Sequence, residues 1–119
     1  FTIIHGLDGY DEISLTNDTK VITNEGEWIM TPEKLGKRMG AATDIYGGNT
    51  VEEAAKMFMT ILNGEGTWAQ NAVVFANAAM ALHCTGAYKN YNDAYLAAVE
   101  SLESGKALGA LKKLVGMQR

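Results

Sequence analysis

Three carboxylates gather beside a histidine near the start of the sequence. His5, Asp8, Asp11 and Glu12 all lie in the stretch HGLDGYDE, residues 5–12. Carboxylate oxygens are ligands that Mg²⁺ prefers, commonly one or two of them together with the phosphates of a substrate. The stretch is therefore a candidate magnesium site. A solvated acidic turn, which is common in proteins, is the alternative interpretation of the same residues.

The adjacency of Asp11 and Glu12 limits how they can share a metal. Neighbouring side chains of an extended strand point to opposite faces, whereas in a loop they need not. The spacing suits two metal ions, or one ion that is bound by one carboxylate while the other carboxylate lies outside the first coordination shell. It suits a single ion bound by both carboxylates less well. His5 is a candidate base or ligand by its titration range. A histidine at the end of a strand is, however, more often a hydrogen-bonded structural group.

Two other features have weaker claims to chemistry. The loop Gly47-Gly48-Asn49-Thr50 leads into a helix, whose N-terminus is a place where anions bind, but any capped helix start has this pattern. The single cysteine, Cys84, lies in an apolar stretch, and we expect it to be a small buried side chain.

The acidic stretch should lie between strands of a small sheet. Residues 1–4 are a short apolar run with β-branched members, typical of a buried strand. Residues 12–16 alternate between apolar and polar, which predicts a second strand with one buried face. Residues 20–23 and 27–30 flank Asn24-Glu25-Gly26 as a further strand pair.

The rest of the sequence predicts helices. A short one starts at Thr31-Pro32-Glu33. A capping box at residues 50–53 precedes a second, which should end at Gly64. Its expected buried face comprises Ala54, Phe58, Ile61 and Leu62.

The last three helices follow from alanine content and from glycine positions. Residues 68–85 are alanine-rich and apolar nearly all round, which predicts a central buried helix. We therefore expect Ala78→Asp to unfold the late helices. Another helix starts at Asn90 or Asn92, and an amphipathic one follows Gly105. Strands followed by helices indicate an α+β segment.

Composition excludes several classes of protein. The chain has 119 residues, the size of one domain, and a net charge of −4. Nucleic-acid binders usually show a basic patch, so we expect no nucleic-acid partner. No apolar run approaches ~18 residues, so we expect no membrane span. One cysteine fits a reducing cytosol, and we expect a cytoplasmic location. We assign the densest basic cluster to a helix end, favoured by the helix dipole: Lys106, Lys112, Lys113 and Arg119.

Residues 5–14, HGLDGYDEIS, closely resemble the His-Gly-x-Asp-Gly-x-Asp-Glu stretch of anthranilate phosphoribosyltransferases. Tyr10 stands where leucine is commoner in that family. The further similarities follow in the family's order and extend the resemblance over nearly all of the chain. They are TPE at 31–33 with Gly36, GGN at 47–49 before a helix ending in ILNG at 61–64, NAA at 77–79, and SGKA at 104–107.

The resemblance implies a reaction and a fold. Members of the family transfer the phosphoribosyl group of 5-phosphoribosyl-1-pyrophosphate (PRPP) to the amine of anthranilate in tryptophan biosynthesis, and they use Mg²⁺. Their fold resembles that of pyrimidine nucleoside phosphorylases, with a small helical domain, a larger α/β domain and commonly a homodimer. The chain would then be an α+β part of a larger α/β domain. The family's magnesium-binding Asp-Glu pair matches Asp11 and Glu12.

Other functional parts of the family lie upstream of the matched stretch. They are the helical domain, the glycine-rich PRPP loop, a Lys-His-Gly-Asn segment and an anthranilate-binding arginine. The sequence also opens on Phe1 rather than methionine. We therefore expect residues 1–119 to be the C-terminal part of the glycosyltransferase α/β domain, cut from a longer chain and inactive alone.

Three alternatives remain at this point. A non-catalytic, nucleic-acid-binding paralogue of the same fold is disfavoured by the net charge of −4 and by the retained Asp11-Glu12 pair. A pyrimidine nucleoside phosphorylase-like enzyme is disfavoured by the sequence of the loop. The third alternative is an α+β interaction module with no chemistry.

Overall fold

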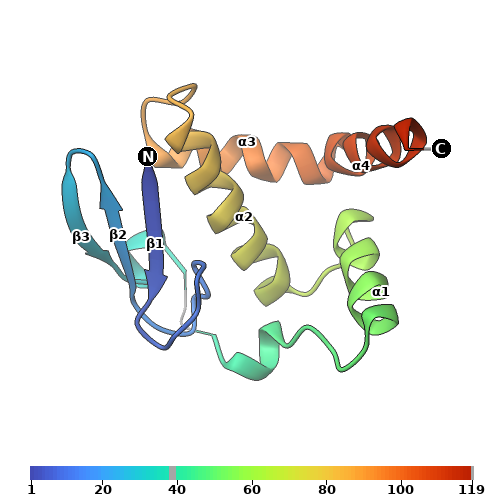
Figure 1. Cartoon of the computed structure of the whole chain (residues 1–119), viewed down its shortest axis with the longest axis horizontal. Helices are drawn as coiled ribbons and strands as arrows, with labels where there is room; N and C mark the ends of the chain where they lie inside the picture. The colour runs from blue at the N-terminus through green and yellow to red at the C-terminus, as the bar shows by residue number, and fades with distance from the viewer. Residues whose placement is uncertain (38–39, 119) are drawn as a thin grey trace.

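The computed structural model describes residues 1–37 and 40–118, and it has a small sheet at one end and helices over the rest (Figure 1). The long helix α2 runs beside the sheet, and α3 and α4 extend away from its C-terminal end toward α1. Strands precede helices, which confirms the predicted α+β arrangement. In chain order the elements are β1 (Thr2–Gly6), β2 (Thr19–Thr23), β3 (Gly26–Met30), the 3-10 helices η1 (Glu33–Leu35) and η2 (Ala42–Ile45), α1 (Val51–Leu62), α2 (Trp68–Cys84), α3 (Tyr91–Glu103) and α4 (Lys106–Met117).

The sheet is antiparallel in the order β1-β2-β3. The strand predicted at residues 1–4 and the pair around Asn24-Glu25-Gly26 are confirmed, with shifts of one or two residues. The burial expected for the first strand is wrong, because Ile3 of β1 is 53% exposed. The strand predicted at residues 12–16 is wrong, because these residues form part of the loop between β1 and β2. Leu15 in that loop has a φ of 60°, a left-handed conformation that a strand does not allow.

The core lies between α2 and the sheet with its loop. The loop contributes Ile13 and Leu15, which are only 1% and 3% exposed. Facing them, α2 presents the small side chains Ala72 and Ala76, which let the helix approach closely. Val21, Met30 and Met80 complete the cluster. The loop between β1 and β2 is therefore rooted in the core rather than lying on the surface.

The second face of α2 packs against α3. The buried alanines Ala79, Ala94 and Ala98 lie on these two helices. The Tyr91 hydroxyl donates a hydrogen bond of 3.0 Å to the carbonyl of Ala76. Burial, reinforced by the neighbouring Tyr95, raises the pKa of the Tyr91 hydroxyl above its ordinary value, so this group stays a donor. The predicted central position of α2 is confirmed.

Some predicted burial is wrong. Cys84 is exposed, because it is the last residue of α2 and the chain turns away through Gly86, whose φ is 77°. Ala78 is half-buried rather than enclosed. On the expected inner face of α1, Phe58 is 52% exposed and Ala54 is also exposed. Periodicity identified the apolar face of α1, but the described residues do not bury it.

Helix starts follow the sequence more closely. Asn90 caps α3 through its side chain, and Thr50 caps α1 by accepting a hydrogen bond of 3.1 Å from the Glu53 amide. The reciprocal bond of a capping box is shifted by one residue, because the Glu53 carboxylate accepts from the amide of Asn49 at 2.6 Å. Gly64, with a φ of 81°, follows the end of α1 as predicted.

The basic cluster does not serve the helix dipole as expected. Lys106 is the first residue of α4 and pairs with Glu100 at 2.7 Å. The last turn of α4 contains no basic residue, and Arg119 lies outside the described residues. Over residues 1–37 and 40–118, no helix combines the length and apolarity that crossing a membrane requires.

The buried face of α2 leads to a stability prediction. Ala76 is fully buried, whereas Ala81 on the same helix is exposed. Ala76→Asp should lower the free energy of unfolding by about 3 to 5 kcal/mol, because it leaves an uncompensated charge in the core. Ala81→Asp, the matched control, should cost about 1 kcal/mol or less. Urea denaturation measures both, and equal losses would contradict this description of the core.

Candidate metal site

The acidic residues lie on the loop between β1 and β2, residues 7–18, which we call the acidic loop. Its first turn is closed by backbone hydrogen bonds from the Gly6 amide to the carbonyl of Tyr10, 2.7 Å, and from the Gly9 amide to the carbonyl of Gly6, 2.9 Å. A side chain at position 6 would approach Asp8 Oδ1 and the Tyr10 carbonyl to 3.1 Å. Glycine therefore allows this tight turn.

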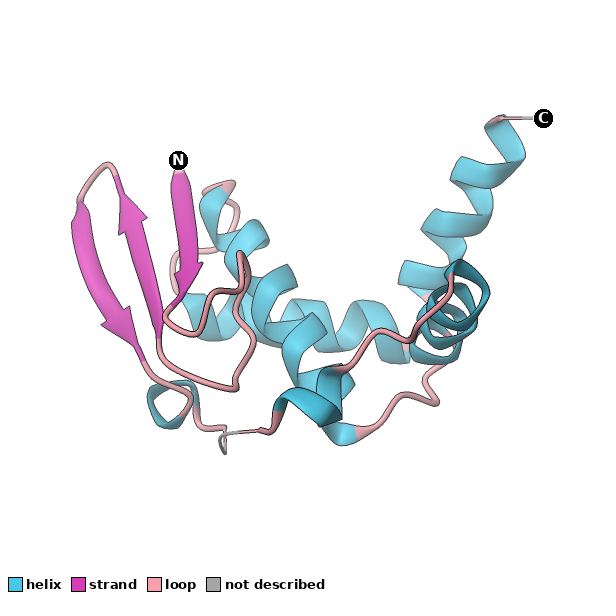
Figure 2. Ribbon diagram, turned by 60° about the horizontal axis from the view of Figure 1, so that its bottom comes forward, coloured by secondary structure: helices cyan, strands magenta, loops and turns pink. Residues whose placement is uncertain are grey.

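The middle of the acidic loop is held by a side chain from α2. Asn77 Oδ1 accepts a hydrogen bond from the Ile13 amide at 2.9 Å, and Asn77 Nδ2 donates one to the Ile13 carbonyl, also at 2.9 Å. The same Nδ2 donates to the carbonyl of Val73 at 2.9 Å, within α2. Two residues further on, the carbonyl of Leu15 accepts from the Gly40 amide at 2.8 Å. Figure 2 shows the loop after β1 lying beside the helices.

Asp8 is engaged inside the acidic loop. Thr16 Oγ1 donates a hydrogen bond of 2.5 Å to Asp8 Oδ2, and Thr16 Oγ1 also lies 2.7 Å from the Oγ of the buried Ser14. A short chain of hydroxyls thus joins the start of the loop to its end. Asp8 has a structural partner, so its carboxylate is less available as a ligand.

Asp11 and Glu12 are exposed and lie directly before the clamped Ile13. Within the described residues, neither carboxylate accepts a hydrogen bond or forms an ion pair. Their oxygens are therefore available to a ligand. The wider predicted set is not gathered into one site, because no three His, Cys, Asp or Glu residues of the described chain form a group that could hold a metal. His5 is exposed on β1, opposite Lys20 of β2.

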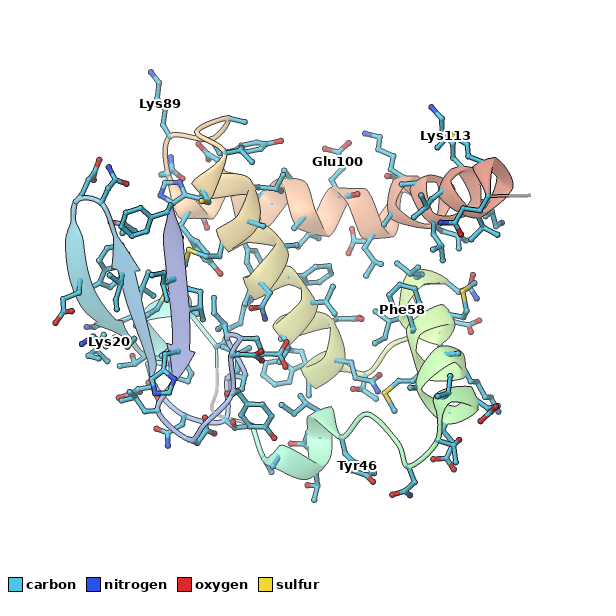
Figure 3. All side chains as sticks on the ribbon, in the orientation of Figure 1. Lys20, Tyr46, Phe58, Lys89, Glu100 and Lys113 are labelled. Atoms are coloured by element: carbon cyan, nitrogen blue, oxygen red, sulfur yellow. The ribbon has the colours of Figure 1, made fainter. Side chains whose placement is uncertain are left out.

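A shallow cavity of about 410 Å³ lies beside the acidic loop. Tyr10 forms one wall, and the others come from η2 and the segment that follows it. Tyr46 extends from that segment (Figure 3), and its hydroxyl is hydrogen-bonded to Asn49 Oδ1. The complete lining is Tyr10, Ala42, Thr43, Ile45, Tyr46 and Gly47.

The predicted anion site at the start of α1 is not supported. The Glu53 carboxylate already accepts from the Asn49 amide, and Thr50 accepts from the Glu53 amide. A helix N-terminus attracts anions through free amide groups and its dipole. Here the Glu53 carboxylate, bonded to the Asn49 amide just before the helix, adds negative charge beside those amides and would repel another anion.

Sequence reasoning alone missed the contribution of Asn77. It recorded this residue only as part of the NAA similarity at 77–79. The sequence could have indicated its role in one way: it is a carboxamide in an otherwise alanine-rich, apolar helix, and a buried polar side chain needs hydrogen-bond partners. Its partner is 64 residues away in the sequence, so nothing local identified it.

Comparison with known proteins identifies a family. The family model described as "Glycosyl transferase family, a/b domain" matches residues 1–108 of this chain. Anthranilate phosphoribosyltransferase of Flavobacterium psychrophilum is 54% identical over 114 residues, which cover 96% of this chain and 34% of that protein. The protein of the same name from Bacteroides thetaiotaomicron is 50% identical, covering 97% of this chain and 35% of its own length. The chain thus spans about a third of the length of these relatives.

Solved structures agree with this comparison. Crystalline anthranilate phosphoribosyltransferase from Thermus thermophilus superposes with a TM-score of 0.84 at 27% identity, over 97% of this chain and 34% of that one. The enzyme from Saccharomyces cerevisiae, solved in complex with PRPP and Mg, has a TM-score of 0.80 at 22% identity, over 93% and 32% of the two chains. The second likeness bears on the fold alone.

The link between Thr16 and Asp8 leads to a prediction for the loop. Thr16→Val keeps the shape of the side chain but removes the hydroxyl that bonds Asp8. We expect it to lower the free energy of unfolding by about 1 kcal/mol, the usual worth of one hydrogen bond. Thr16→Ser, which keeps the hydroxyl, should lose less. Chemical denaturation of both variants tests this, and a larger loss for Thr16→Ser would contradict the assigned bond.

Proposed function

We propose that this chain, which belongs to the glycosyl transferase family by its a/b domain, is the C-terminal part of an anthranilate phosphoribosyltransferase. The reaction would transfer the phosphoribosyl group of PRPP to the amine of anthranilate and release pyrophosphate, within tryptophan biosynthesis. The observation that carries the proposal is the pair Asp11 and Glu12, which are exposed and have no partner among the described residues, beside Ile13, which Asn77 holds in place. That pair lies in a chain 54% identical to a protein of this name.

The donor set fits a magnesium ion. Magnesium is usually held by one or two carboxylates together with substrate phosphates, rather than by a cage made only of protein groups. Asp11 and Glu12 would supply those carboxylates. When bound, the ion supplies charge neutralisation to the departing pyrophosphate. Asp11 and Glu12 would place carboxylate oxygens at the outer face of the acidic loop. Asp8 is less suited to this role, because its carboxylate accepts a hydrogen bond from Thr16.

The remaining parts of the reaction would come from outside this chain. We propose that residues 1–119 form the C-terminal part of the glycosyltransferase α/β domain. The segments that bind anthranilate and most of PRPP would lie upstream, so this chain alone should be inactive. This agrees with the chain spanning about a third of the relatives' length, 34% for the Flavobacterium psychrophilum protein. A homodimer and a cytoplasmic location are further parts of the proposal, carried by the family resemblance.

The alternatives are not favoured. The Flavobacterium, Bacteroides and Thermus proteins described above all carry the name of the transferase. A nucleic-acid-binding paralogue would need a basic surface, and the chain has a net charge of −4. The loop sequence that favours the transferase over a nucleoside phosphorylase lies in the stretch matched by the relatives.

The activity is tested in the longer protein that contains this chain. We expect the fluorescence of anthranilate to fall on incubation with PRPP and Mg²⁺, and to stay constant when either is omitted. The isolated chain of 119 residues should give no loss under the same conditions. A folded longer protein that leaves the fluorescence unchanged would overturn the proposed activity.

The metal assignment is tested by two neutral substitutions. Asp11→Asn and Glu12→Gln keep side-chain size but remove the charge that attracts the ion. We expect each to lower turnover at limiting Mg²⁺ by about 10- to 100-fold, the usual effect of disturbing a metal site. The control is Glu25→Gln, in the exposed turn between β2 and β3, which should behave as the parent. Parent-like magnesium dependence in both loop variants would remove the assignment.

A further inference from the structure

We infer that Asn77 of α2 is a positioning residue, which fixes the direction in which Asp11 and Glu12 present their carboxylates. The inference rests on the proposed function, because it concerns how the proposed magnesium ligands are held. Within the described residues, Asn77 forms no hydrogen bond with either carboxylate. It acts through the backbone of Ile13, the residue that follows Glu12.

Ile13 is fixed at three points. Its amide and its carbonyl are both hydrogen-bonded to the Asn77 side chain, and its own side chain is 1% exposed in the core. The planar peptide bond transmits this restraint to Glu12, because the backbone has only two soft dihedrals per residue. Fixing Ile13 therefore fixes the plane of the peptide that joins it to Glu12, and it limits the directions that Glu12 and Asp11 can take.

The orientation of the Asn77 amide is also determined. Its Nδ2 donates to two carbonyls, those of Ile13 and Val73, while its Oδ1 accepts from the Ile13 amide. Exchanging the oxygen and nitrogen would place an acceptor against two acceptors and a donor against a donor. Only a carboxamide of this length provides both the donor and the acceptor that Ile13 requires. Aspartate keeps the acceptor but loses the donor.

Other contacts keep the acidic loop folded without the clamp. Leu15 lies in the core and its carbonyl is bonded to Gly40, while the Leu7 amide is bonded to the Asp18 carbonyl at 2.9 Å. Loss of the Asn77 bonds should therefore free the direction of residues 11–12 more than it destabilises the protein. This separates a positioning role from a purely structural one.

The main test measures metal binding directly, and a turnover measurement accompanies it. Mn²⁺ is titrated into the longer protein, with and without pyrophosphate, and the free ion is followed by electron paramagnetic resonance. We expect Asn77→Asp to weaken Mn²⁺ binding about 10- to 100-fold, the range found when groups that orient metal ligands are altered. The Mg²⁺ concentration for half-maximal turnover should rise in parallel, while the KM for anthranilate stays unchanged.

A control and a second variant make the result decisive. Asn71→Ala removes another carboxamide from α2. Among the described residues, this side chain forms a single hydrogen bond, which it donates to the Gly66 carbonyl, away from the acidic loop. The variant should therefore bind Mn²⁺ as the parent does. If Asn77→Asp does not fold, Asn77→Ser carries the test, because a hydroxyl can bond only part of the Ile13 backbone and should give a smaller loss of Mn²⁺ affinity.

The outcomes separate this inference from the proposed function. A lowered melting temperature with unchanged Mn²⁺ binding in the Asn77 variants would overturn the positioning role alone. Equal weakening in Asn71→Ala would also overturn it, because the effect would then belong to the helix in general. A parent protein that binds no Mn²⁺ would overturn the proposed metal site and this inference together.

Discussion

The position of the acidic loop against α2 is set by one pair of hydrogen bonds, between the Asn77 side chain and the backbone of Ile13. A loop that enters the core must find partners for its buried amide and carbonyl groups, since an unpaired one costs about as much as a lost hydrogen bond. The acidic loop enters the core through Ile13 and Leu15, and within the described residues it is not paired with any strand of the sheet that could supply those partners. One carboxamide from α2 takes the place of a neighbouring strand. The helix that anchors the sheet therefore also anchors the acidic loop.

This arrangement divides the acidic residues by role. The Asp8 carboxylate accepts a hydrogen bond from the Thr16 hydroxyl, and the Glu53 carboxylate accepts one from the Asn49 amide just before α1. Asp11 and Glu12 are left without internal partners in the part of the chain that the structure describes. A carboxylate that stabilises its own fold is a poor ligand, whereas one held at a fixed place without a partner is available to a cation. Of the acidic residues in the loop, Asp11 and Glu12 are therefore the two best suited to bind a metal ion.

Much of the fold could be predicted from local patterns, and the errors have a common cause. Asn90 at the start of α3 and Gly64 after α1 act where the sequence placed them, because capping is a local interaction. Alternation around Ile13 and Leu15 correctly predicted that these two side chains are buried, but it missed the burial of Ser14 between them and the left-handed conformation of Leu15. Cys84 and the face of α1 show that periodicity identifies an apolar surface without saying what covers it. The role of Asn77 required a contact across 64 residues, which no local pattern contains.

We propose that the acidic loop, held by α2, places Asp11 and Glu12 as ligands of a divalent cation. The most direct measurement is anomalous diffraction from crystals of the longer protein soaked with Mn²⁺ and PRPP. We expect an anomalous peak at coordinating distance from the Asp11 or Glu12 carboxylate, about 2.0 to 2.2 Å for a hard divalent cation, with Asn77 still bonded to Ile13. A bound Mn²⁺ and PRPP with no peak at these carboxylates would contradict the account.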